Sequence, residues 1–63
     1  MTRLNEDWIA LFLGWGITID PAALEFRLMP PGRRLEVCFY RGFMPIQYDT
    51  LTAVQYTTLR LIA

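Results

Sequence analysis

The chain has 63 residues, 54% of them hydrophobic, and six arginines balance six acidic residues to give a net charge of zero. This length allows one domain, residues 1–63, and the balanced charge gives no overall field that would draw the chain to nucleic acid or an anionic membrane. Histidine and serine are absent and there is one cysteine, which excludes a Ser-His or Cys-His nucleophile pair, a structural zinc site and an internal disulfide.

The run Trp8–Ile17 carries no charge, holds both tryptophans and predicts the first helix. Four large side chains in it recur at the spacing of one helical face: Trp8, Leu11, Phe12 and Trp15. Asn5 can cap the start, because its side-chain oxygen can accept from a free backbone N–H, and Gly14 can end the helix. The pattern therefore predicts a helix from about residue 5 to residue 13 or 15.

The flanks of this helical face are apolar as well. Ile9 and Leu13 widen it, and Trp15 lies at its end. One small sheet and one further helix can cover the face but not its flanks, and a large exposed apolar patch normally marks an interaction surface. We therefore expect Ile9, Leu13 and Trp15 to contact a partner protein or a second copy of the chain.

Residues 20–28 fit two structures. Asp20-Pro21 could begin a helix, because proline is favoured at the first helical position. Against this, Leu24, Phe26 and Leu28 alternate with charged residues, as in a strand with one buried face. The alternation resumes over residues 35–40 after a strong turn signal, which favours a strand and an antiparallel hairpin.

The register of this hairpin can be proposed from both faces together. If partner numbers sum to 63, Phe26 lies opposite Val37 on the apolar face and Arg27 lies opposite Glu36 on the polar face. The expected core residues of the sheet are Leu24, Phe26, Leu28, Leu35, Val37 and Phe39. Cys38 falls on the polar face, where we expect it to be half-buried and structural.

The rest of the chain predicts a short strand and a helix. Arg41-Gly42 indicates a turn and Phe43–Tyr48 a third strand, which belongs at a sheet edge because Pro45 cannot donate a ladder hydrogen bond. Asp49 or Thr50 is expected to cap the second helix. Its core face would hold Leu51, Val54, Thr58, Leu61 and Ile62, with Tyr56 and Arg60 roughly opposite. The predicted fold is α+β: an N-terminal helix, an antiparallel two- to three-stranded hairpin or meander, and a C-terminal helix.

The segment Arg41–Tyr48 resembles the first ribonucleoprotein motif of the RNA-recognition-motif family. The matching residues are Arg41, Gly42, Phe43, Ile46 and Tyr48. Met44 and Pro45 stand where the motif has a small residue and an aromatic. The resemblance covers eight residues and implies a nucleic-acid-binding surface, to which Arg33 and Arg34, expected near the hairpin tip, could add phosphate contacts.

The function expected from these residues is protein binding. Aromatic residues and arginine are enriched in protein interfaces, and several lie outside the expected core: Arg33, Arg34, Tyr40, Arg41, Phe43 and Tyr48. No two carboxylates are spaced as an acid–base couple, so we expect no enzyme, and we expect no cofactor, metal or membrane span. Without a signal-peptide pattern, a cytoplasmic protein is predicted.

We therefore predict an accessory subunit or inhibitor of a larger protein or complex that can also form a homo-oligomer. Phage-encoded antagonists of host defence, anti-CRISPR proteins among them, share this size and composition. The alternative is a small nucleic-acid-binding module that uses Arg33, Arg34, Arg41 and Phe43.

Overall fold

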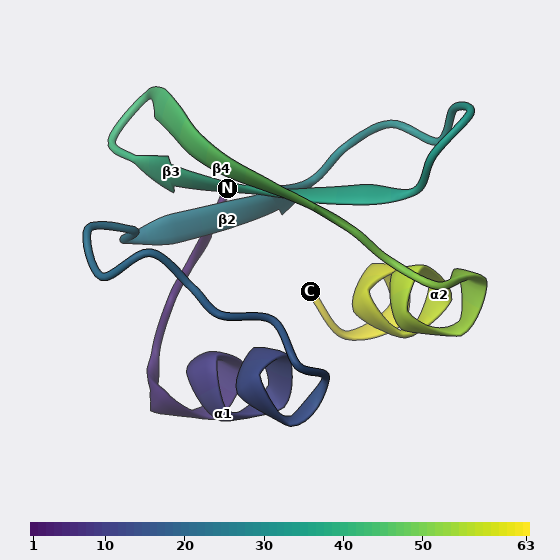
Figure 1. Ribbon diagram of the computed structural model, residues 1–63, viewed down its shortest axis with the longest axis horizontal. Coiled ribbons are helices and arrows are strands. Elements are labelled where there is room, and N and C mark those ends of the chain that lie inside the picture. The colour runs from purple at the N-terminus through teal and green to yellow at the C-terminus, as the bar shows by residue number, and fades with distance from the viewer.

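The computed structural model describes all 63 residues. Its elements, in chain order, are β1 (Thr2–Arg3), α1 (Glu6–Gly14), β2 (Glu25–Leu28), β3 (Glu36–Arg41), β4 (Met44–Thr50) and α2 (Ala53–Ile62). The strands form one antiparallel sheet in the order β1-β2-β3-β4. Both helices lie on the same side of this sheet (Figure 1). The predicted α+β fold is confirmed, with four strands in place of two or three.

The additional strand is β1, in a segment where the sequence pattern predicts neither helix nor strand. Thr2 pairs with Phe26 and Arg3 with Glu25, and the Leu4 N–H donates to the Leu24 carbonyl at 2.9 Å. Two residues are too few to show a hydrophobic alternation, so this pairing leaves no signal in the sequence. Its consequence is that β2 becomes an internal strand.

Helix α1 begins as predicted, because the Asn5 side chain accepts from the Trp8 N–H at 2.9 Å. Its inner face builds an aromatic core under the sheet. The Phe12 ring meets the rings of Phe26 and Phe39 edge-on, at centroid distances of 5.0 and 5.1 Å. All three of these side chains are fully buried. Edge-to-face aromatic pairs of this kind stabilise a core beyond the effect of their buried area.

The predicted hairpin is present, but the predicted register differs from the observed one by two residues. Phe26 lies opposite Phe39, and Arg27 lies opposite Cys38 instead of Glu36. A shift of two residues leaves every side chain on its predicted face, so alternation alone could not detect it. The predicted register left residues 29–34 in the connection, and the structure moves the connection one residue along to 30–35, with the Met29 N–H donating to the Glu36 carbonyl at 2.9 Å. Leu24, expected in the core, precedes the strand and is 38% exposed.

Two predictions for α2 are wrong. Asp49 and Thr50 continue β4, and the cap is Thr52, which forms a capping box with Gln55. The buried face carries Tyr56 and Leu59, and the predicted core residues Val54, Leu61 and Ile62 are exposed. Because α2 has apolar residues on both sides, its sequence did not decide which side packs. A contact outside the helix helps to hold the observed side inward: the Tyr56 hydroxyl donates to the Met29 carbonyl at 2.5 Å.

Candidate functional site

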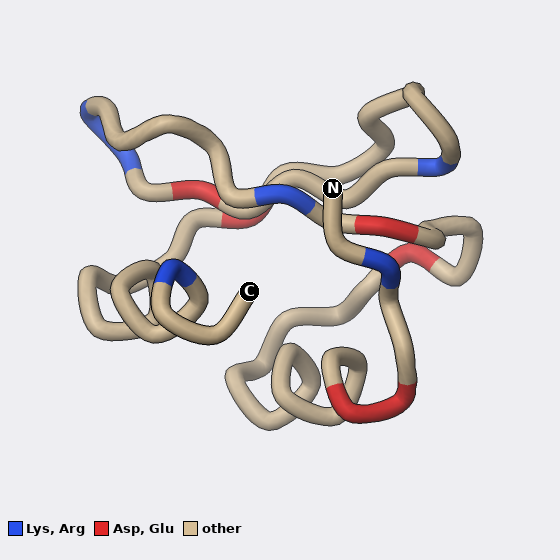
Figure 2. The backbone as a smooth tube through the Cα atoms, turned by 180° about the vertical axis from the view of Figure 1, so that it is seen from behind, with Lys and Arg blue, Asp and Glu red and all other residues tan.

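One face of the sheet, which we call the outer face, has no helix over it, because α1 and α2 both cover the other face (Figure 1). The strand register and the alternation of side chains place two rows of residues across it. The first row is Arg3, Glu25, Tyr40 and Pro45, and the second is Met1, Arg27, Cys38 and Tyr48. Figure 2 shows that acidic and basic positions interleave along the strands and do not gather in one region.

Two residues of the outer face are buried without help from a helix. Cys38 is fully buried, where half burial was expected, and its thiol lies 3.7 Å from the Phe39 carbonyl oxygen. Tyr40, which was expected to lie outside the core, is also buried. The Arg27 guanidinium carbon lies 5.8 Å from the centroid of the Tyr40 ring, which is a cation–π distance. The arginine stem and head thus cover part of the tyrosine ring.

The tight turn between β3 and β4 projects the most exposed aromatic ring of the chain. Gly42 has φ of 63° at the first of the two turn positions, a conformation that glycine adopts without strain. Phe43 at the second position is 95% exposed. It lines a depression of about 280 Å³ together with Met1, Arg27 and Tyr40. The turn chemistry therefore aims Phe43 into solvent beside the outer face.

An exposed side chain on β4 extends this region, because Tyr48 lies on the outer face and is 54% exposed. We call the whole region the outer patch, defined as Met1, Arg27, Tyr40, Phe43 and Tyr48.

Tyr48 has an altered acidity. A side-chain hydrogen bond with Cys38, the residue opposite it on β3, and Coulombic repulsion from Cys38 raise the pKa of Tyr48 above that of a free tyrosine. The phenol of Tyr48 therefore stays protonated to a higher pH than that of a free tyrosine.

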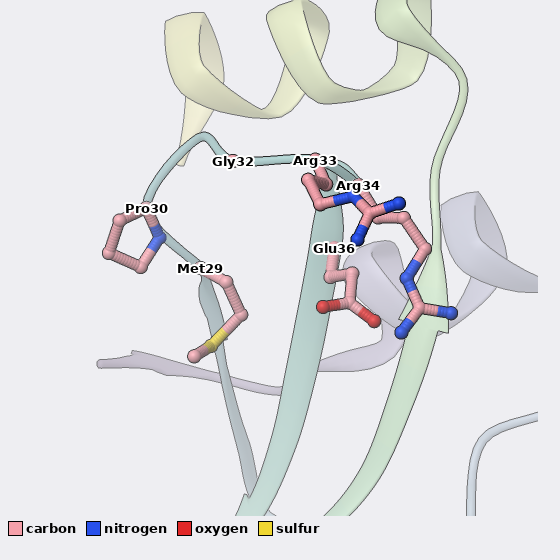
Figure 3. Close-up of a pocket in the computed structure, with 6 residues that line it drawn as sticks. All are labelled: Met29, Pro30, Gly32, Arg33, Arg34 and Glu36. Carbon is pink, nitrogen blue, oxygen red and sulfur yellow. The ribbon is translucent and has the colours of Figure 1, made fainter.

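Arg33 and Arg34 lie at the opposite end of the sheet from the Gly42-Phe43 turn. They line a cavity of about 750 Å³ in the loop between β2 and β3, together with Met29, Pro30, Gly32 and Glu36. Figure 3 shows both guanidinium groups on the same side of the loop as the Glu36 carboxylate. Sequence reasoning placed these arginines at the hairpin tip, and the structure keeps them apart from the aromatic residues of the outer patch.

Three further candidate residues lie on the helical layer, Ile9 and Leu13 in α1 and Trp15 directly after it. Ile9 and Leu13 are 38% and 56% exposed. Trp15 is half-buried, packs against the core and has its ring 6.1 Å from that of Phe12. Of the expected partner-binding residues, the structure therefore gathers only Tyr40, Phe43 and Tyr48 into one patch.

Arg41, which follows Tyr40 in the sequence, does not join this patch. One of its guanidinium nitrogens donates a hydrogen bond to the Ala22 carbonyl at 3.4 Å. Sequence reasoning missed Met1 and Arg27 as members of the patch. Arg27 was assigned a glutamate partner by the shifted register, and Met1 reaches the patch only through the unpredicted β1. The alternation of side chains along β2 and β3 places Arg27 and Tyr40 on the same face, and this was the sequence feature that could have grouped them.

Neither of the helices is long and apolar enough to cross a membrane. No cluster of three or more His, Cys, Asp or Glu side chains could hold a metal ion. The segment that resembles the ribonucleoprotein motif is split between a turn, which holds Phe43, and the edge strand, which holds Tyr48. No family model, curated protein or solved structure matches the chain.

Proposed function

We propose that this protein is a non-enzymatic protein-binding module that docks on a partner protein through the outer patch. The observation that carries the proposal is an uncovered sheet face on which exposed aromatic, methionine and arginine side chains adjoin. These residue types are enriched in the centres of protein interfaces. Phe43 is the natural anchor, because its ring is almost wholly free to enter a pocket on a partner.

The charge of the outer face favours protein over nucleic acid as the partner. Arg3 and Arg27 on this face are offset by Glu25 and by Glu36 farther along β3. A surface that binds nucleic acid gains most of its affinity by neutralising phosphates, which requires an excess of basic residues. The arginine pair Arg33 and Arg34 lies at the other end of the sheet.

The role within a complex is the less detailed part of the proposal. A module of this size without catalytic residues would act as an accessory subunit or as an inhibitor of a larger protein. The idea of a phage-encoded antagonist, anti-CRISPR proteins included, stays a prediction from size and composition.

The test compares single substitutions on two exposed apolar surfaces. Phe43→Ser and Tyr48→Ser alter the outer patch, and Val54→Ser alters the outer side of α2, where the side chain is 76% exposed. Wild type captures the partner from a lysate of the source cells, and the affinity of the purified pair is then measured by calorimetry. We expect each patch variant to weaken binding by about tenfold or more, the loss of about 1.4 kcal/mol or more that marks a hot spot.

Val54→Ser is expected to bind like wild type. A partner that both patch variants bind with unchanged affinity contradicts the proposal. A salt-dependent complex with single-stranded RNA that Arg27→Ala or Arg33→Ala weakens would favour the nucleic-acid alternative.

A further inference from the structure

The loop between β2 and β3, which holds the cavity of about 750 Å³, has a fixed base. The Met29 N–H donates to the Glu36 carbonyl at 2.9 Å, and the Leu51 N–H donates to the Leu35 carbonyl at 2.7 Å. From α2, the Tyr56 hydroxyl donates to the Met29 carbonyl at 2.5 Å. The cavity therefore rests on a frame that contacts from three parts of the chain hold in place.

The loop carries hydrogen-bond donors without partners in the chain. Arg41 is the only arginine whose side chain donates a hydrogen bond, so the guanidinium groups of Arg33 and Arg34 are free. Figure 3 shows both groups on the same side of the loop. The N–H groups of Gly32, Arg33 and Arg34 take part in none of the backbone hydrogen bonds outside the helices and strands. Five donors or donor groups are thus available within three consecutive residues.

These donors indicate the chemistry of a ligand. Guanidinium groups and consecutive backbone N–H groups are the donors that proteins use to hold a phosphoryl group. The cavity has room for the rest of a small molecule as well, because sites for such molecules enclose about 300–1,000 Å³. Its one acidic lining residue, Glu36, would repel a bare anion, but the carboxylate can accept from a hydroxyl group of a larger ligand.

We propose that this loop binds a small phosphate ester that carries hydroxyl groups. Arg33 and Arg34 hold the phosphoryl group, and Glu36 accepts a hydrogen bond from a hydroxyl group of the same molecule. The phosphates of a nucleic acid would need further basic residues beside this pair, and the other arginines are dispersed over β1, β2, β3 and α2 (Figure 2). The inference goes beyond the proposed function and does not depend on it, because the cavity lies at the opposite end of β3 from Phe43.

An NMR titration of the unaltered chain with glycerol phosphate, at neutral pH and constant ionic strength, is the direct test. The amide resonances of Gly32, Arg33 and Arg34 should shift and saturate. Arg33→Ala and Arg34→Ala should each raise the dissociation constant by about tenfold or more, since charge-assisted hydrogen bonds are lost. Both residues are exposed, so circular dichroism should show that the variants stay folded.

Arg27→Ala is the matched control, because it removes a guanidinium group from another part of the sheet, and it should bind glycerol phosphate like wild type. Shifts that do not saturate, or a loss of affinity in Arg27→Ala equal to that in Arg33→Ala, would overturn the proposal.

A second ester tests the role of Glu36. Propyl phosphate has the same number of carbons as glycerol phosphate and no hydroxyl group, so the wild type should bind it about fivefold or more weakly. Glu36→Ala should remove this preference and bind propyl phosphate more tightly than wild type does, because the repelling carboxylate is gone. Equal affinity of the wild type for the two esters, or a preference that survives in Glu36→Ala, contradicts the proposed class of ligand.

Discussion

The two faces of the sheet bury aromatic rings by different means. On the inner face Phe26 and Phe39 are sealed by α1, whose Phe12 ring meets both edge-on. On the outer face Tyr40 has no helix above it and is covered by neighbours such as Arg27. Inner-face residues therefore support the whole fold, whereas outer-face residues can change with smaller losses. This difference in how the two faces are covered can be measured by substitutions.

The largest difference is expected between Phe26→Asp and its matched control Phe43→Asp. Phe26 is fully buried and Phe43 is 95% exposed. An unpaired carboxylate at position 26 would lose its hydration inside the aromatic core, a penalty comparable to the total stability of a small domain. Circular dichroism should show an unfolded Phe26→Asp protein and a folded Phe43→Asp protein. A Phe26→Asp protein that melts like wild type would contradict the described core.

A smaller difference is expected between two adjacent residues of β3 on opposite faces. Phe39→Ala leaves a cavity under α1 and should lower the free energy of unfolding by about 3–5 kcal/mol. Tyr40→Ala removes a ring that only side chains cover and should cost about 1.5–3 kcal/mol. Urea unfolding of both variants measures the two losses. Equal losses would mean that the outer face is packed as firmly as the inner one.

Arg27 tests how the outer face is covered. Arg27→Ala should lower the free energy of unfolding by about 0.5–1 kcal/mol, because the cation over the Tyr40 ring and its stem are both lost. Arg27→Met keeps much of the stem and should lose less, and Arg33→Ala, in the remote loop, should lose nothing measurable by urea unfolding. If Arg27→Ala and Arg33→Ala unfold alike, Arg27 does not stabilise Tyr40.

The smallest expected effect is the titration of Tyr48, which reports the packing around Cys38. Its pKa is raised mainly by a side-chain hydrogen bond with Cys38, so the folded chain favours the protonated phenol. The protonated Tyr48 contributes fully to the free energy of unfolding below the pKa of tyrosine in the unfolded chain. This contribution is lost as pH rises through the higher pKa of Tyr48 in the folded state. NMR titration should give Tyr48 a higher pKa than the tyrosine of a free peptide, and Cys38→Ala should bring the pKa of Tyr48 closer to the peptide value. An unchanged pKa in Cys38→Ala would remove the thiol as the cause.

Part of the candidate site could be predicted from sequence, because it depends on composition and local turn chemistry. Phe43 and Tyr48 were identified as residues outside the core, and both are exposed. Grouping them with Arg33 and Arg34 into one surface failed, because the loop before β3 holds the two arginines and the turn after β3 holds Phe43, and these lie at opposite ends of that strand. Met1 and Arg27 could not be assigned without the pairing of β1 and the true register.

The sequence by itself determined the types and order of the main elements, the Asn5 cap, the edge position of the strand with Pro45, and the face on which each residue of β2 and β3 lies. These features follow from interactions within a few residues: hydrogen-bonding caps, the missing donor of proline, and the two-residue period of a strand. Only the tertiary structure decided the two-residue register shift, the pairing of β1 and the buried side of α2. Each of these features depends on a choice between arrangements whose local interactions are almost equal in energy. A shift of two residues preserves both faces of a strand, and α2 is apolar on both sides. Contacts between distant segments, such as the Tyr56 hydroxyl on the Met29 carbonyl, choose among them.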